Sequence, residues 1–322
     1  MTDLIPMRTR STRSRRAFTL VEILTALFIL SIIGLAFVRL MTSQSRFAEG
    51  QMALRNARSV SRNAMNILLT DLRMVQDSGG LVAASRDSVT VRVPVAFGLL
   101  CGAAAGSTTI SLLPIDSSMT ALGWYAGWAY RDSANAHYVY NPAGTPVSFT
   151  SFPAQTIADS TLCAANAILP GNIQQPGISP VTYGTRRGKV VVITDPTTPL
   201  VNINGVAPNA GWPVFLYQQV TYKFAHSSAY PGRIGLFRLV RAANVMAPVT
   251  DEIIAPFDSA GAKFRFYVLN ADVAQDAPPA HLWEVRGVEL NLAGSSPRAQ
   301  QGRAAAKQTL VTGVFFKNRR DP

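Results

Sequence analysis

The chain has 322 residues, 48% of them hydrophobic, which is enough to bury a core in one large domain or two smaller ones. Its formal net charge of +12 invites a nucleic-acid-binding interpretation. The basic surplus is scattered, however, with only small clusters at residues 186–189 and 317–320. We therefore expect a solvated basic surface that touches lipid headgroups or a neighbouring subunit, and we do not expect a nucleic-acid partner.

Residues 1–17 form a short basic leader. They contain five arginines against one aspartate. Short basic flanks stay on the cytoplasmic side of a membrane span. The leader is therefore predicted to lie inside the cell, and everything after Leu40 outside it.

The leader is followed by an apolar run at residues 18–40, FTLVEILTALFILSIIGLAFVRL, whose only charges are Glu22 and Arg39. About 20 apolar residues in a helix cross a bilayer core of about 30 Å, so one membrane span is predicted. A secretory signal peptide has a shorter apolar core, and its small-residue cleavage site comes after that core. Here the small residue, Ala17, precedes the apolar run, so an ordinary signal peptide is disfavoured.

The segment at residues 15–22, RRAFTLVE, resembles the processing motif of type IV prepilins and type II secretion pseudopilins. The resemblance combines a basic leader, a small residue and an apolar span in one order. It implies that a prepilin peptidase cuts after Ala17 and that Phe18 becomes the N-methylated first residue. The family more often has glycine at the position of Ala17.

Glu22 has a physical argument of its own. An ionised carboxylate in a membrane segment is costly unless a cation pairs with it, and no Lys or Arg lies near Glu22 within the span. A free amine on Phe18 would supply that charge. The resemblance implies that this glutamate engages the N-terminal amine of a neighbouring subunit during assembly. The alternative is a carboxylate close enough to the interface to reach water.

The helical pattern continues over residues 41–78 as an amphipathic segment. Asp77-Ser78-Gly79-Gly80 predicts where it stops. Apolar residues recur at spacings of three and four, which is typical of a helix that lies on a core. The predicted core positions are Val60, Ala64, Ile67, Leu68, Leu72 and Val75.

Residues 79–322 are predicted to form an extracytoplasmic, β-rich head. Period-two patterns indicate strands at residues 88–95, 189–194, 214–224, 233–241, 263–268, 282–292 and 309–316. The predicted fold class is α+β, with a long N-terminal transmembrane and amphipathic helix packed on antiparallel β-sheets. That architecture is the pilin fold that the resemblance implies.

Residues 96–185 are interpreted as a loop-rich insertion that contains both cysteines, Cys101 and Cys163. An oxidising compartment would let the two cysteines pair, and we expect a disulfide, with two unpaired buried thiols as the alternative. The insertion also holds an aromatic patch. We favour a local core for it over a carbohydrate or partner surface. Its members are Trp124, Tyr125, Trp128, Tyr130, Tyr138 and Tyr140.

The sequence offers no motif for catalysis, a metal or a cofactor. The three histidines, His137, His226 and His281, are not spaced with cysteines or carboxylates as a zinc site. No nucleophile elbow and no phosphate-binding loop is present in the sequence. We therefore expect no catalytic residues, no metal site, no cofactor and no enzyme activity.

The second half of the chain resembles J-type minor pseudopilins and W-type minor pilins in the order of its segments, such as Val220-Thr221-Tyr222 and Phe264-Arg265-Phe266-Tyr267. The expected function is a minor pilin or pseudopilin that helps initiate or cap a type IV pilus or type II secretion pseudopilus. The alternative is a filament-mounted module whose head binds DNA, carbohydrate or a secreted substrate. Expected partners are the prepilin peptidase, other pilin or pseudopilin subunits and the inner-membrane assembly platform. The expected location is the inner membrane, with a single span and a cytoplasmic N-terminus, and then the filament.

Overall fold

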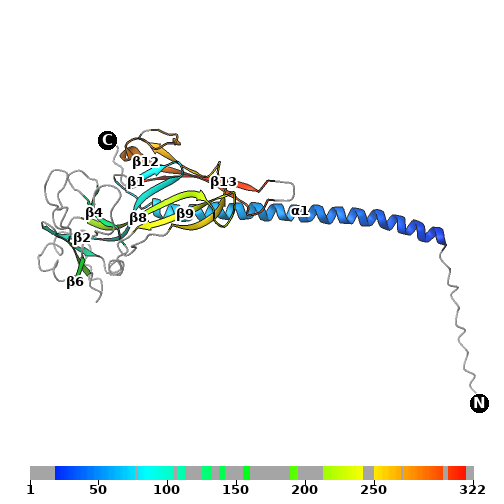
Figure 1. The fold of residues 1–322 in the computed structure, drawn as a ribbon, viewed down its shortest axis with the longest axis horizontal. Helices are drawn as coiled ribbons and strands as arrows, with labels where there is room; N and C mark the ends of the chain where they lie inside the picture. The colour runs from blue at the N-terminus through cyan, green and yellow to red at the C-terminus, as the bar shows by residue number, and fades with distance from the viewer. Residues whose placement is uncertain are drawn as a thin grey trace, which may run out of the picture. The chain divides into compact units, whose positions relative to one another are not determined.

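The computed structural model describes residues 19–76, 79–104, 107–112, 125–131, 138–141, 155–159, 189–194, 213–241, 250–269, 271–299 and 304–316. The chain forms two compact units, residues 1–52 and 53–322, and the helix α1 (Leu20–Leu72) contributes to both. An antiparallel β-sheet follows the helix, which confirms the predicted α+β class (Figure 1). The strands are β1 (Leu81–Ser85), β2 (Ser88–Ala104), β3 (Ser107–Leu112), β4 (Gly127–Arg131), β5 (Tyr138–Asn141), β6 (Gln155–Asp159), β7 (Lys189–Thr194), β8 (Pro213–His226), β9 (Ile234–Arg241), β10 (Thr250–Phe257), β11 (Lys263–Val268), β12 (Val285–Ser295) and β13 (Lys307–Phe315), with a short 3₁₀ helix, η2 (Leu282–Glu284), before β12.

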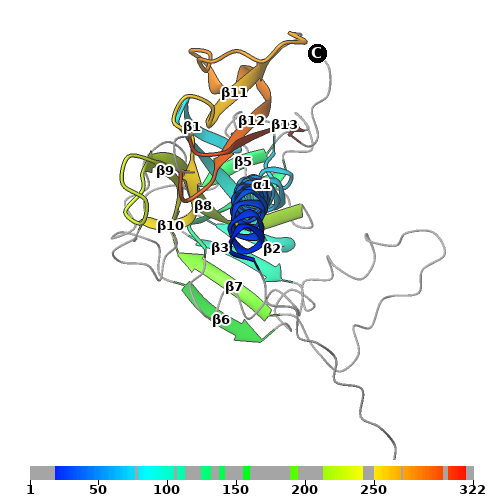
Figure 2. The same cartoon turned by 90° about the vertical axis from the view of Figure 1, so that its right-hand side faces the viewer.

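The sheet has 13 strands in the order β11-β12-β10-β9-β8-β2-β3-β7-β6. Off this path, β1 pairs with β2, β13 pairs with β12, and β4 pairs with both β5 and β8. The view along α1 shows the strands of the head arranged around the helix (Figure 2). Residues 53–72 of α1 belong to the same compact unit as the sheet, and one face of this part of the helix is buried.

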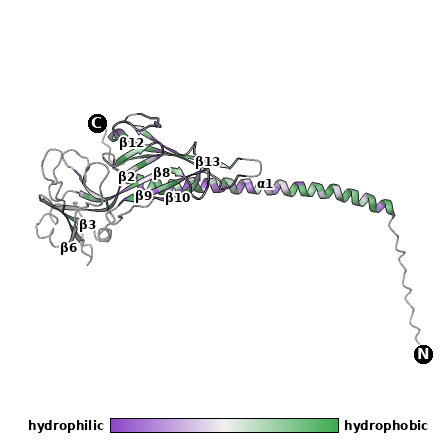
Figure 3. Cartoon of the chain, viewed as in Figure 1, coloured by the Kyte–Doolittle hydropathy of each residue, from purple (hydrophilic) through white to green (hydrophobic). Residues whose placement is uncertain are grey.

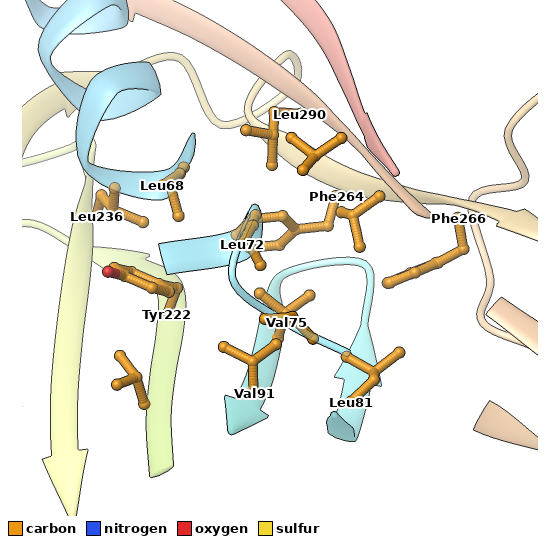
Figure 4. Close-up of a cluster of buried hydrophobic side chains, with 14 of the residues drawn as sticks. Leu68, Leu72, Val75, Leu81, Val91, Tyr222, Leu236, Phe264, Phe266 and Leu290 are labelled. Carbon is orange, nitrogen blue, oxygen red and sulfur yellow. The ribbon is translucent and has the colours of Figure 1, made fainter. Parts of the chain in front are cut away.

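The buried face of α1 follows from the spacing of small and apolar residues. Leu68, Leu72 and Val75 pack between β8 and β9 on one side and β11 and β12 on the other (Figure 4). Ile67 was predicted to join this stripe, and that prediction was wrong, because Ile67 is 37% exposed. One residue is a turn of about 100° around a helix, so Ile67 and Leu68 cannot share the centre of a narrow stripe. The buried stripe within the helix consists of Ala53, Ala57, Ser61, Ala64, Leu68 and Leu72.

Small residues allow α1 to approach the backbone of the sheet closely. A Cβ placed on Gly294 of β12 would lie 2.2 Å from the carbonyl oxygen of Ala57, so only glycine fits there without a shift. The Ser61 hydroxyl accepts a hydrogen bond from the Gly294 amide and lies within hydrogen-bonding distance of the Leu292 carbonyl. The helix therefore docks on β12 through backbone contacts as well as through apolar packing.

The helix ends before the predicted stop. Its last residue is Leu72, and the amides of Met74 and Val75 donate to carbonyls three residues back, which tightens the chain into a final 3₁₀-like turn. Gly79 then adopts a positive φ of 76°, which disfavours other residues. The chain can thus reverse into β1, and Asp77 and Ser78 lie outside the described residues.

The segment at residues 96–185, predicted to be loop-rich, is described only in part, and its described parts are mostly strands. The end of β2 and strands β3, β4, β5 and β6 all lie within it. The aromatic side chains that fall in described parts are mostly core, as favoured from the sequence. Tyr125, Trp128, Tyr130 and Tyr140 are buried, Tyr138 is half-buried against Phe215, and Trp124 lies outside the described residues.

Candidate functional site

The predicted processing residues Ala17 and Phe18 lie outside the described residues, so the site begins structurally at Thr19. Thr19 precedes α1 and caps it, because its side-chain oxygen accepts a hydrogen bond from the amide of Glu22 at 3.3 Å. The Ile23 amide donates to the Thr19 carbonyl and closes the first helical turn. Thr19-Leu20-Val21-Glu22 has the spacing of a capping box.

Glu22 lies in this first turn and is exposed. A carboxylate near a helix N-terminus is stabilised by about 0.3–1 kcal/mol through the helix dipole. The presence of a glutamate at position 22 is therefore explained in part by its own helix. The surrounding side chains, Val21, Ile23 and Leu24, are large, apolar and exposed. The next basic residue in the helix, Arg39, is 17 positions away, which corresponds to about 25 Å along the axis. The helix itself therefore supplies no cationic side chain to Glu22.

The helix that carries Glu22 is suited to a membrane. By length and composition, α1 can cross a membrane once. Figure 3 shows apolar residues over its N-terminal part and more polar residues further along. Its hydroxyl side chains bond within the helix, since Ser31 donates to the Leu27 carbonyl and Thr25 to the Glu22 carbonyl. These bonds leave few unsatisfied polar groups on an apolar surface.

The predicted disulfide concerns Cys101 and Cys163. Cys101 belongs to β2, and nothing is described of its side chain, while Cys163 lies outside the described residues. The pairing therefore stays a prediction. Within the described ranges, no three His, Cys, Asp or Glu side chains group as metal ligands.

The aromatic patch is divided between two small cores on opposite faces of β4 and β8. Tyr125, Trp128 and Tyr130 pack with Val214 and Leu216. Tyr140 and Tyr217 belong to the other core, together with Phe215. Burial raises the pKa of Tyr217 to about 12 even though the nearby Arg92 opposes the shift. These described rings are structural, and they do not form an exposed stacking surface for a sugar or a base.

A polar cluster that sequence reasoning missed joins α1 to the sheet. The Tyr222 hydroxyl on β8 donates to Asp71 Oδ2 at 2.5 Å, and Arg238 Nη2 on β9 lies 3.2 Å from the same oxygen. Burial, reinforced by the Asp71 carboxylate, raises the pKa of Tyr222 well above its ordinary value. The only sequence signal for this cluster was a charged residue, Asp71, directly before the core residue Leu72. That signal does not identify the partners of Asp71, which lie more than 150 residues away.

A second cluster lies on the outer face of β11 and β12. Arg265 Nη1 contacts Glu289 Oε1 at 2.8 Å, and the Tyr267 hydroxyl and the Asn291 amide also donate to this carboxylate. Burial opposes ionisation of Glu289, but these three donors outweigh it, so the pKa of Glu289 lies below its ordinary value. Asp276 completes the cluster by pairing with Lys263 and Arg265. Every described charge in this cluster has an opposite partner, which favours a structural role.

Comparison with known proteins supports the N-terminal segment as the functional site. Residues 12–38 match the family model for the prokaryotic N-terminal methylation motif. No curated protein and no solved structure matches the chain. The matched range contains the leader's end, the predicted cleavage position and Glu22. The motif supports a membrane-anchored subunit of the pilin or pseudopilin type, processed by a peptidase and assembled with other such subunits. It favours a structural subunit over an enzyme.

Proposed function

We propose that the chain is a minor pilin or pseudopilin, a subunit of a type IV pilus or type II secretion pseudopilus that helps initiate or cap filament assembly. One observation carries the proposal: the methylation motif at residues 12–38 coincides with the start of an exposed apolar helix whose first turn holds Glu22. A J-type pseudopilin or a W-type minor pilin is the subtype that we favour.

Processing and assembly are linked through charge. Cleavage after Ala17 creates an amine on Phe18, four residues before Glu22. In a membrane, each of these charges needs a partner, because an unpaired ion in a low-dielectric medium costs several kcal/mol. Pairing the amine of one subunit with Glu22 of a neighbour satisfies both charges. The Thr19 cap holds the first turn in helical form, so the position of Glu22 is fixed before a neighbour arrives.

The size of the head supports a minor subunit. Residues 53–322 form one compact unit built on a 13-stranded sheet. A head of this size is hard to repeat at every position of a helical filament, but it is easily placed at an end. The proposed topology has a cytoplasmic leader, a single span in the inner membrane and an extracytoplasmic head. The prepilin peptidase and the inner-membrane assembly platform are the proposed partners before incorporation.

Filament content tests the proposal. The amount of subunit in purified filaments is compared for wild type, Glu22→Ala and Glu22→Gln at matched membrane levels. Loss of one partner of a buried ion pair costs about 3–5 kcal/mol. The amount of either variant in filaments should therefore fall by more than tenfold relative to wild type. Gln at this position can still serve a capping box, and it therefore separates ion pairing from helix capping.

Glu49→Ala is the matched control, because Glu49 is another exposed glutamate on α1. Its incorporation should equal that of wild type. Normal incorporation of Glu22→Gln would contradict the ion-pair mechanism, and a chain absent from filaments of the wild-type strain would contradict the proposed function itself.

A further inference from the structure

The part of α1 that belongs to the head carries four exposed arginines. We call this set the arginine stripe: Arg55, Arg58, Arg62 and Arg73. Arg73 directly follows the last residue of α1, and its amide still donates to the Leu69 carbonyl, so it continues the helix. The single acidic residue from position 51 to position 76 is Asp71, whose carboxylate already binds a tyrosine and an arginine of the sheet. Figure 3 shows this part of α1 as largely hydrophilic.

The four arginines lie in one row along the helix. The steps from Arg55 to Arg62 and from Arg62 to Arg73 each return to within about 20° of the same direction, and Arg58 lies within about 40° of Arg62. The row extends over about 27 Å of the helix axis, at about 1.5 Å per residue. The stripe is therefore a straight line of positive charge on one side of α1.

The fold of the head does not neutralise this line of charge. Among the residues that the structure describes, no carboxylate forms an ion pair with any of the four guanidinium groups. Arg58 Nε donates to Gln308 Oε1 at 3.4 Å, and that amide carries no charge. By contrast, basic side chains on β9, β11, β12 and β13 of the same head pair with carboxylates.

The stripe works against the helix that carries it. Like charges three or four residues apart destabilise a helix, and both Arg55 with Arg58 and Arg58 with Arg62 have this spacing. Folding of the head therefore does not explain the four arginines. A planar guanidinium binds a carboxylate through two parallel hydrogen bonds, and arginine is enriched at interfaces between proteins. The row favours an anionic partner.

The chain itself is a poor source of that partner. It has 30 basic residues against 18 acidic ones. In a second copy, the exposed acidic residues of α1 are Glu22 and Glu49, which are too far apart to match the row. A helix that lies on a membrane inserts an apolar face, but the apolar face of this part of α1 is buried in the head. A straight row at helical spacing instead fits carboxylates that repeat along another helix.

We propose that the arginine stripe of α1 docks an acidic α-helix of a different protein, whose carboxylates repeat at spacings of three, four and seven residues. Bidentate pairs between guanidinium and carboxylate groups hold the two helices side by side, and the repulsion among the arginines is relieved when the partner arrives. The inference rests on the proposed function only for the source of the partner, which is a fellow subunit of the filament. The stripe itself is defined by the head.

Photo-crosslinking in cells that express the full-length chain tests this docking. A benzoylphenylalanine is placed singly at Ser59 or Asn66, which are exposed positions beside the stripe, and the crosslinked residue of the partner is mapped by mass spectrometry. The two mapped residues should lie about seven positions apart, because neighbouring helices rise equally per residue. Each should have an Asp or Glu within one turn. The control position, Val273, is 71% exposed and lies outside α1, and it should not crosslink to that helix.

Charge reversal provides the second arm. Arg62→Glu should lower the yield of adducts by at least tenfold, because it sets like charges against each other across the interface. Arg298→Glu, an equal change of charge at an exposed position outside α1, should leave the yield unchanged. Replacing the mapped acidic residue of the partner by arginine should restore the yield of Arg62→Glu. The melting temperature of this variant should not fall, because a carboxylate at position 62 meets Arg58 one turn earlier.

Adducts with an acidic helix of a second protein, together with rescue by the charge swap, support the inference. Adducts within the chain, with a second copy, with lipid or with nucleic acid would each overturn it, as would no adducts or no rescue. A lower melting temperature of Arg62→Glu would also overturn it, because the stripe would then serve the fold of the head. Processing at Ala17 and incorporation into filaments are measured in the same cells. If both are normal and the adducts are absent, the docking fails while the proposed function stands.

Discussion

The amide of Gly294 on β12 donates a hydrogen bond of 2.9 Å to the hydroxyl of Ser61 on α1. This contact exists because neither residue carries a bulky side chain at the point where helix and strand meet. A Cβ on Gly294 would also lie 2.5 Å from the Ser61 oxygen. Close approach of α1 to β12 is thus a central feature of the head, and it makes a direct prediction about stability.

Gly294→Ala should destabilise the head by about 1–3 kcal/mol, because the added methyl group meets backbone atoms that cannot rotate away. Thermal unfolding of the full chain in detergent measures the change. The control is Gly34→Ala, since a Cβ there has no atom within 4 Å and alanine favours a helix. A Gly294→Ala protein as stable as the control would show that α1 and β12 are further apart than described.

The Asp71, Tyr222 and Arg238 cluster should behave as one unit. Tyr222→Phe removes the donor to Asp71 and should cost about 1–2 kcal/mol, and Asp71→Ala should cost more because it also removes the partner of Arg238. The double variant should be less destabilised than the sum of the two, with a coupling of about 0.5–3 kcal/mol. Additive effects in denaturant unfolding would argue against a direct Tyr222 to Asp71 bond.

Glu289 makes the stability of the head depend on pH. Its folded-state pKa lies below the ordinary value of 4.5, so the ionised group stabilises the fold above about pH 4.5, and that contribution is lost as the pH falls through the folded-state pKa. Glu289→Gln should therefore lower stability at neutral pH and flatten the decline in acid. The readout is the free energy of unfolding from about pH 7 to about pH 3. Parallel curves for the two proteins would contradict the assignment.

The pairing of the two cysteines is predicted from the sequence alone. Cys101 and Cys163 should be joined in protein isolated from the compartment outside the inner membrane. Peptide mapping without reductant detects the linked peptides directly, and a bridge that closes a loop of about 60 residues should stabilise by roughly 4 kcal/mol. Two thiols that react with an alkylating agent in freshly isolated, folded protein would count against the bridge.

The parts of the fold that were predictable have local causes. The apolar span was predicted from composition, and Glu22 from the motif around it. Strands such as β7 and β11 were predicted with the bounds that the structure shows, because period-two alternation is a local property of the sequence. The burial of Ile67 was predicted wrongly. A helix with both small and large apolar residues does not show from its sequence alone which face contacts the sheet. Gly294 lies two residues beyond the strand predicted at residues 282–292, and its contact with Ala57 appears only with the packing.

Long-range pairing explains most of what sequence reasoning missed. The partners of Asp71 lie on β8 and β9, more than 150 residues away in the sequence. Strands β3 to β6 lie in a stretch rich in small and turn-forming residues, where the period-two signal is short. The pairing of β3 with the long strand β2, and of β4 with the long strand β8, outweighs weak local preference.

The first residue of the mature chain distinguishes prepilin-type processing from ordinary signal-peptide cleavage. The protein is isolated from membranes and from filaments, and the mass of its N-terminal peptide is measured in both. We expect a chain that begins with N-methylated Phe18, because the proposed topology puts the bond after Ala17 at the cytoplasmic end of the span, where a prepilin peptidase would cut. An intact leader in filament-associated protein, or a chain that begins well after Leu35 as ordinary signal-peptidase cleavage would produce, would contradict it.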